Sequence, residues 1–202
     1  LLMKMLNLPF SERKLSFADP QWRVKLRQIS PAGKVPVLFD GTHMIWDSLA
    51  IVEYIADTHP HAGVWPKDQA ARAYARSMCA EMHAGFGALR NNMPMNIEAK
   101  LSGRGWNRTV QIDVDRIVAL WTEARARFGA GGPMLFGDFC AADAFYAPVV
   151  WRFTTYEVEV PDAIEAYMRS VRELPAMREW VQEAIAEHEY VAEDEPYRST
   201  HS

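Results

Sequence analysis

Asp47 and Ser48 are the residues whose types and placement best suit the binding of a charged ligand. They lie in "GKVPVLFDGTHMIWDSLAIVEYIADTHP", which runs from Gly33 to Pro60, directly before an apolar helical pattern. Both residue types favour helix capping, and capping leaves a second role open. A helix N-terminus presents free N–H groups and a positive dipole end, which suit a carboxylate. With the Ser48 hydroxyl as a further donor and Asp47 as a partner for an ammonium, the pair suits an α-amino acid head group.

Pro36 lies between two valines, in a run that is otherwise typical of a short buried strand. A proline removes a donor from the sheet and is confined to strand edges, strand starts or bulges, so an edge-strand proline is one interpretation. A cis bond between Val35 and Pro36 is the other. It would leave neighbouring backbone N–H and C=O groups facing outward, where an extended peptide can pair with them. Together with Asp47 and Ser48, this backbone would suit a short peptide with a free amino-acid end.

The other reactive residue types have plainer interpretations. Cys79 and Cys140 stand in unrelated surroundings, which favours two buried free thiols over a disulfide or a metal cluster. His59 and His61 flank a proline, and we expect no metal role for them. The glycine-rich run 129–132 lacks the lysine and the following Ser or Thr of a phosphate-binding loop. The sequence therefore predicts no metal site.

The composition limits the classes of partner. The chain has 202 residues with a net charge of −4, of which 49% are hydrophobic and 24% are charged. No basic run stands out, which argues against nucleic acid as a partner. No apolar stretch approaches the roughly 20 residues of a membrane helix, and the two cysteines fit a reducing compartment. We therefore expect a cytoplasmic protein that binds neither nucleic acid nor membranes.

The hydrophobic periodicity changes near residues 60–67. Before this point the pattern predicts a small α/β layer in the order helix, strand, helix, strand, strand, helix, with "FSERKLSF" (10–17) as its first strand. After it the sequence predicts helices only, over about 68–92, 107–129, 141–154, 162–172 and 175–188. The expected fold class is α/β plus all-α, with an α/β domain over 1–60, a Pro/Gly-rich linker over 61–67 and an all-helical domain over 68–202.

Three stretches of the sequence resemble the glutathione S-transferase family. "GKVPVLFDG…WDSLAIVEYIAD" is similar to the glutathione-binding segment of that family. "ALRNNMPMNI" and "LFGDFCAADAFYAPVV" resemble the helical domain of bacterial members near the zeta-like, maleylacetoacetate isomerase-like group. The resemblance covers nearly the whole chain. It implies a thioredoxin-like N-terminal domain, an all-helical C-terminal domain, a homodimer, and glutathione as co-substrate.

The resemblance also assigns roles to particular residues. It implies that Val35 hydrogen-bonds the cysteinyl backbone of glutathione before a cis Pro36. It implies that Asp47 and Ser48 bind the γ-glutamyl end, and that Lys34 lies near the glycine carboxylate. These expectations agree with the reading of the same residues as a backbone clamp and a cup for a zwitterion.

The activity that the resemblance implies is attack of the glutathione thiolate on an electrophilic small molecule. A free thiol has a pKa of about 8.5, so a protein group must stabilise the thiolate. In the family this group is a Ser, Tyr or Cys near the end of the first strand, whereas this sequence begins at Leu1, inside the helix that follows that strand. We therefore assign no catalytic residue, and expect the strand and the donor in roughly 15–20 residues upstream of Leu1.

Two alternatives to conjugation stay open. One is glutathione-dependent cis–trans isomerisation of the maleylacetoacetate isomerase type, in which glutathione adds to a double bond and leaves again. The other is a non-catalytic protein-binding module. For the electrophile, Phe86, Met93 and Trp121 are candidates to line an acceptor site between the domains, although a methionine–aromatic stripe at helical spacing is also typical of a core or a dimer interface.

The remaining polar residues receive structural or minor roles. Asp143 is interpreted as a structural residue that caps a helix together with Cys140, where the family usually has Ser or Thr. His83 is interpreted as a partly buried polar residue and not as a base. Arg90 and Asn91 could reach the glutathione site, and solvation at the surface is the alternative.

Overall fold

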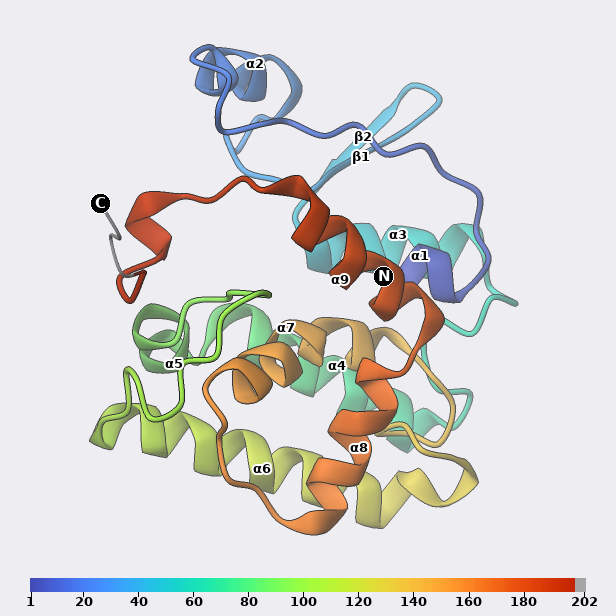
Figure 1. Cartoon of the computed structure of the whole chain (residues 1–202). Coiled ribbons are helices and arrows are strands. Elements are labelled where there is room, and N and C mark those ends of the chain that lie inside the picture. The colour runs from blue at the N-terminus through green and yellow to red at the C-terminus, as the bar shows by residue number, and fades with distance from the viewer. Residues whose placement is uncertain (199–202) are drawn as a thin grey trace.

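The N-terminal part of the chain forms a thin layer of two short strands and three helices above the helical part (Figure 1). The structure is a computed structural model that describes residues 1–198. The elements of this layer are α1 (Leu2–Met5), α2 (Trp22–Ile29), β1 (Val37–Asp40), β2 (His43–Trp46) and α3 (Ser48–Thr58). Helix α1 lies beside α9, the last helix of the chain, where the Lys4 Nζ atom is 2.9 Å from Glu179 Oε1. The order of strand, strand and helix after residue 36 confirms the prediction for this segment.

Strands β1 and β2 form an antiparallel hairpin with a two-residue turn. Gly41 has a φ of +55° in this turn, a conformation that glycine adopts without strain. Successive side chains of a strand point to opposite faces. Leu38 and its cross-strand partner Ile45 pack against the core on one face. On the other face, Phe39 and its partner Met44 are exposed.

The strand predicted over residues 10–17 does not form. This segment is irregular, and no backbone hydrogen bond within the described residues joins it to the sheet. A strand needs a neighbour for its backbone N–H and C=O groups, and β1 pairs with β2 alone in the part of the chain that the structure describes. The local alternation of residues was therefore insufficient to predict a strand.

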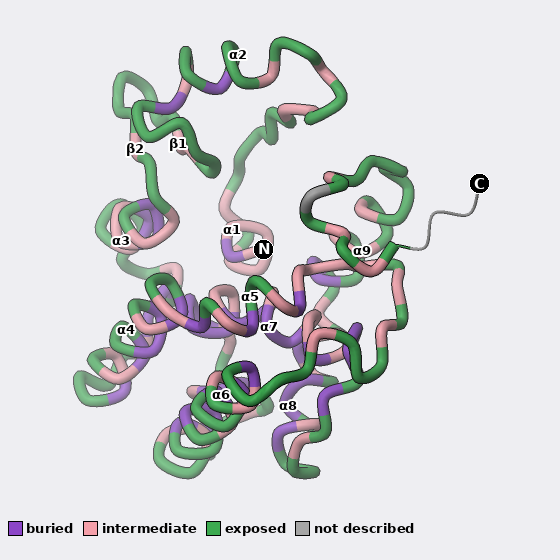
Figure 2. Tube along the Cα trace, turned by 90° about the vertical axis from the view of Figure 1, so that its left-hand side faces the viewer, coloured by how far each residue is buried: buried purple, intermediate pink, exposed green. Residues whose placement is uncertain are grey.

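The second part of the chain is helical, as the sequence predicts. Its helices are α4 (Gln69–Ala84), α5 (Gly87–Asn92), α6 (Arg108–Phe128), α7 (Ala141–Thr155), α8 (Asp162–Arg172) and α9 (Pro175–Glu187), with short 3₁₀ turns at Gly129–Gly131 and Ala192–Asp194. The core lies between α4, α6, α7 and α8, where Figure 2 shows the buried residues gathered. Among residues 1–198, no helix combines the length and the apolar character needed to cross a bilayer.

The single helix predicted over 68–92 is broken at Gly85 and Phe86. Phe86 adopts a left-handed φ of +56° between α4 and α5. The break frees the backbone N–H of Leu89, which donates to Asp113 Oδ2 of α6 at 2.9 Å. The apolar spacing continues across the break, because Phe86 and Leu89 are both buried, and this continuity made the stretch resemble one helix.

Asp143 fixes the start of α7. It accepts hydrogen bonds from the backbone N–H of Cys140 at 2.9 Å and of Leu135 at 3.1 Å. Its side chain is fully buried, and burial raises the pKa of this carboxyl from 3.8 to about 6. These contacts support the structural interpretation of Asp143. Cys79 and Cys140 are both free and buried, as expected, and burial raises the pKa of each thiol.

Candidate functional site

The segment before β1 is held by one serine. The Ser30 hydroxyl donates to the backbone C=O of Lys34 at 2.6 Å and accepts from the Lys34 N–H at 3.1 Å. Ser30 is itself buried, and Gly33 has a φ of +61° in the turn between these residues. The Val35–Pro36 bond that follows is cis, which confirms the second interpretation of Pro36.

Val35 presents free backbone groups two residues before the start of β1. The residue is 61% exposed. Neither its N–H nor its C=O makes a hydrogen bond to another of the described residues. Unpaired backbone groups at the end of a strand can pair with an extended peptide. These unpaired groups lie where the sequence predicts a peptide-docking edge.

Asp47 caps α3, and Ser48 is its first residue. Asp47 has a φ of +73°, and its Oδ1 atom accepts a hydrogen bond from the Leu49 N–H at 2.9 Å. The backbone N–H groups of Ser48 and Ala50 have no partner among residues 1–198. Asp47 and Ser48 together with these free N–H groups are called the Asp47–Ser48 cup below. It offers an acidic group, a hydroxyl and helix-terminal donors, which suit an ammonium and a carboxylate.

His83, from the helical part of the chain, contacts both Asp47 and Ser48. It lies in the last turn of α4, with its Nε2 atom 3.0 Å from Asp47 Oδ2. Its Nδ1 atom is 3.5 Å from Ser48 Oγ. The residue is exposed, so the interpretation of His83 as partly buried was wrong. No local pattern indicates this role, because it depends on how α4 packs against α3.

The three acceptor-site candidates lie in the core. Met93 and Trp121 have no exposed surface, and Phe86 is 7% exposed. The Trp121 ring contacts the rings of Tyr146, Phe153 and Tyr167, with centroids 5.6, 5.6 and 5.1 Å away. The acceptor-site interpretation of these three residues is corrected on this ground. A methionine–aromatic stripe at helical spacing is here a packed core.

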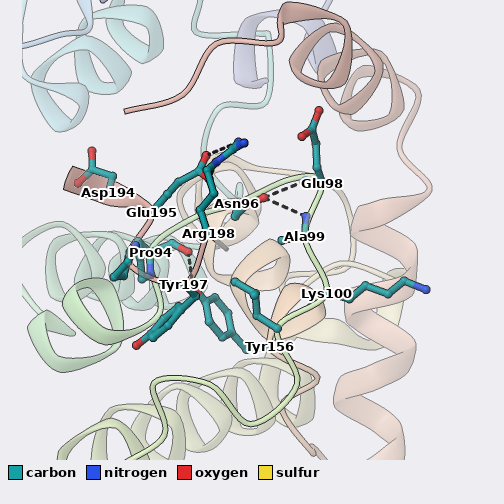
Figure 3. Close-up of a pocket in the computed structure, with 12 residues that line it drawn as sticks. Pro94, Asn96, Glu98, Ala99, Lys100, Tyr156, Asp194, Glu195, Tyr197 and Arg198 are labelled. Atoms are coloured by element: carbon teal, nitrogen blue, oxygen red, sulfur yellow. Dashed lines mark hydrogen bonds and ion pairs between the residues drawn. The ribbon is translucent and has the colours of Figure 1, made fainter. Parts of the chain in front are cut away.

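Two hollows lie along residues 188–198, the C-terminal tail. The smaller, of about 360 Å³, is bounded by the loop after α5, Tyr156 and the tail (Figure 3). At its rim, Asn96 Oδ1 accepts from the N–H groups of Glu98 and Ala99 at 3.1 and 2.9 Å. The larger, of about 930 Å³, is lined by apolar side chains that include Phe17, Trp22 and Tyr190, and by charged ones that include Arg23, Glu187 and Glu189. Neither hollow is lined by Val35, Asp47 or Ser48.

Comparison with known proteins agrees with this fold. A family model of the glutathione S-transferase N-terminal domain matches residues 1–58, and one of the C-terminal domain matches residues 71–183. The chain is 27% identical over 155 residues to a probable maleylacetoacetate isomerase from Caenorhabditis elegans, covering 76% of this chain and 72% of that relative.

Two solved structures share the fold. One is a glutathione transferase homolog from Burkholderia with bound glutathione, with a TM-score of 0.67, 22% identity and coverage of 91% of this chain and 88% of that one. The other is a bacterial maleyl pyruvate isomerase of the zeta class, with a TM-score of 0.65, 18% identity and coverage of 87% of this chain and 86% of that one.

The fold is a thioredoxin-like domain joined to a helical domain, which confirms the expected fold class. The chain belongs to the glutathione S-transferase family. Within that family its similarities lie near the zeta group.

Proposed function

We propose that the protein binds glutathione and activates its thiol for attack on an electrophilic small molecule. One observation carries the proposal: the free backbone of Val35 and the Asp47–Ser48 cup stand at the two ends of the β1–β2 hairpin segment. Such a pair of features suits a peptide with an amino-acid end. Membership of the family and a glutathione-bound structure of the same fold support the same ligand.

Each group of the site has a role in this proposal. The N–H and C=O of Val35 pair with the cysteinyl backbone of glutathione, which would place its sulfur beside the β1 edge. Asp47 holds the ammonium of the γ-glutamyl end, and the Ser48 hydroxyl with the free N–H groups of α3 holds its carboxylate. Lys34, which is exposed, pairs with the glycine carboxylate.

Stabilisation of the thiolate is assigned to none of the described residues. Each unit by which the thiol pKa falls below about 8.5 requires about 1.4 kcal/mol of preferential stabilisation of the thiolate. Cys79 and Cys140 are unsuited to any thiol chemistry of their own, because both are buried and burial raises their pKa values.

The first test is calorimetric titration of glutathione into the protein and into Asp47→Asn. Asparagine keeps the helix cap and tolerates the positive φ of Asp47, but it removes the negative charge. A hydrogen bond to a charged group contributes about 1.5–3 kcal/mol, so affinity should fall roughly 10- to 100-fold. Asp57→Asn, at the exposed end of the same helix, is the matched control and should bind as the wild type does.

Two outcomes would count against the assignment. Equal affinities of Asp47→Asn and wild type would remove Asp47 from the site. No binding by the wild type at millimolar glutathione would favour the third interpretation, a non-catalytic protein-binding module. The presence of the Asp47–Ser48 cup supports the ligand-binding interpretation, because a scaffold has no need of free donors and a carboxylate in this arrangement.

Isomerisation is the second candidate function. Its support is the similarity to a probable maleylacetoacetate isomerase. An isomerase adds glutathione to a double bond and releases it again, so glutathione is not consumed. Product analysis with limiting glutathione separates the two activities. Conjugation yields one adduct for each glutathione, whereas isomerisation converts an excess of substrate with no adduct accumulating.

We also propose a cytoplasmic homodimer. The family membership supports both statements. The exposed apolar side chains of the hairpin, which include Phe39 and Trp46, are available for a subunit contact. Sedimentation velocity measures the mass in solution directly. A single species with the mass of one chain at micromolar concentration would contradict the homodimer.

A further inference from the structure

Two side-chain pairs join α3 to α4, and they differ in what the α3 residue does. Near the middle of α3, Glu53 accepts two hydrogen bonds from Arg76, at 2.9 and 2.7 Å. At the head of α3, Asp47 Oδ2 is 3.0 Å from the Nε2 atom of His83, in the last turn of α4. Asp47 is the residue to which the proposed function gives the ligand ammonium. The second pair therefore joins the helical part of the chain to the proposed ligand site.

Both oxygens of the Asp47 carboxylate have a partner within the protein. Oδ1 accepts from the Leu49 N–H at 2.9 Å, and Oδ2 lies 3.0 Å from His83 Nε2. A carboxylate only accepts, so Nε2 carries the hydrogen, as it can in the neutral ring and in the imidazolium alike. The two oxygens offer about four acceptor positions, so one position on each oxygen is left over. A ligand ammonium can therefore share the carboxylate with the two protein donors.

The contact with His83 limits the rotation of this carboxylate. The side chain of Asp47 is 44% exposed, so packing alone does not hold it. The terminal torsion of an aspartate is broad, and one hydrogen bond at Oδ1 leaves the plane of the group weakly defined. A second donor at Oδ2 defines that plane. A group that already has its binding orientation loses less conformational freedom when the ligand arrives.

We propose that His83 is a positioning residue for the α-ammonium group of glutathione and acts through Asp47. Its Nε2–H holds Oδ2, so that the remaining acceptor positions of both carboxylate oxygens are presented to the ammonium. A residue of the helical part of the chain thereby sets the preference for ligands with a free α-amino group. The inference deepens the proposed function and rests on it, since it requires the γ-glutamyl end of glutathione to bind at the Asp47–Ser48 cup.

Glutaryl-Cys-Gly is the matched probe for the ammonium. It keeps the α-carboxylate, the thiol and the glycine end of glutathione and lacks only the α-amino group. Calorimetric titration with each peptide gives two dissociation constants, and their ratio is called the amine selectivity below. The wild type should prefer glutathione by roughly 10- to 100-fold, because the probe cannot form the charged hydrogen bonds to Asp47.

His83→Leu removes the donor and keeps a side chain of similar size. Its affinity for glutathione should fall about 3- to 10-fold, as expected for one hydrogen bond, while its affinity for glutaryl-Cys-Gly should change less than about two-fold. The amine selectivity should therefore fall by nearly the same factor, and His83→Ala should repeat the result. His83→Gln, whose amide nitrogen can still donate to Asp47, should keep the amine selectivity of the wild type.

Arg76→Gln is the matched control. It breaks the other side-chain pair between the same two helices and leaves Asp47 with both of its partners. Weaker packing of α4 on α3 should lower the affinities for both peptides together, so the amine selectivity of Arg76→Gln should equal that of the wild type. Circular dichroism of each variant shows whether the helices are retained.

The outcomes separate the inference from the function beneath it. An unchanged amine selectivity in His83→Leu and His83→Ala, or an equal fall in Arg76→Gln, would overturn the role of His83 and leave the proposed function intact. Equal affinities of the wild type for the two peptides would show that Asp47 holds no ammonium, which would overturn the inference while glutathione binding stands. No binding of glutathione by the wild type would overturn the proposed function, and the inference with it.

Discussion

At the scale of single residues, Asp143 joins a loop to a helix with one carboxylate. Its two oxygens accept hydrogen bonds from the backbone N–H groups of Leu135 and Cys140, and the Asp143 side chain is fully buried. Burial raises the pKa of this carboxyl above its ordinary value of 3.8, to about 6. The native protein therefore holds the Asp143 proton more tightly than the unfolded chain does.

This difference predicts a pH dependence of stability. The raised pKa of Asp143 adds to the free energy of unfolding. This contribution is fully present below about pH 4 and is lost as the pH rises through about 6, because in this range the unfolded state binds fewer protons than the native state. The free energy of unfolding of wild type minus that of Asp143→Asn should fall by up to about 3 kcal/mol between these pH values. Urea denaturation at several pH values measures it. Asp138→Asn, an exposed neighbour, is the control, and parallel curves for wild type and Asp143→Asn would refute the prediction.

At the scale of elements, the break between α4 and α5 depends on the absence of a side chain at Gly85. A Cβ atom built there would lie 2.6 Å from the backbone O of Glu81, which is closer than real contacts allow. Gly87, two residues on, has open space around the same position. The same substitution at the two glycines therefore separates crowding from the general effect of adding a methyl group.

Gly85→Ala should destabilise the protein by about 1–3 kcal/mol, because the backbone of α4 must shift to relieve the clash. Gly87→Ala should change stability by less than about 1 kcal/mol, in either direction. Urea denaturation of both variants and the wild type gives the comparison. Equal effects of the two substitutions would show that the contact at Glu81 does not determine the break.

Local signals predicted most elements of this chain, and non-local contacts explain the failures. Helix α8, over Asp162–Arg172, was predicted residue for residue, because its apolar period and its flanking residues mark both ends. Residues 10–17 have the alternation of a strand but no neighbour to pair with in the described chain. The Asp47–Ser48 cup was predictable because capping is local. His83 was missed as a site residue because its position depends on the packing of α4 on α3.

At the scale of the whole molecule, the C-terminal tail returns to the helical domain and closes over it. The Tyr197 hydroxyl donates to the backbone O of Asn92 at 2.8 Å, and its ring meets the Tyr156 ring edge-on, with centroids 6.2 Å apart. Gly105 lies against the same place, where a Cβ would be 2.9 Å from the Tyr197 hydroxyl. These contacts bind residues 192–198 to the loop after α5 (Figure 3).

Tyr197→Ala should release the tail, because it removes both the hydrogen bond and the ring contact. Limited proteolysis should then cut between about residues 188 and 196 several-fold faster than in the wild type, while cleavage of the helical core stays unchanged. Tyr197→Phe keeps the ring and loses only the hydroxyl, so it should give an intermediate rate. Identical rates for all three proteins would mean that Tyr197 does not hold the tail.

The exposed apolar face of the hairpin has a consequence for how the protein behaves in concentrated solution. Phe39, Met44 and Trp46 are large apolar side chains that remain exposed, and such side chains favour association with a surface that can cover them. Colloidal stability at high concentration would therefore depend on whether a partner surface covers this face.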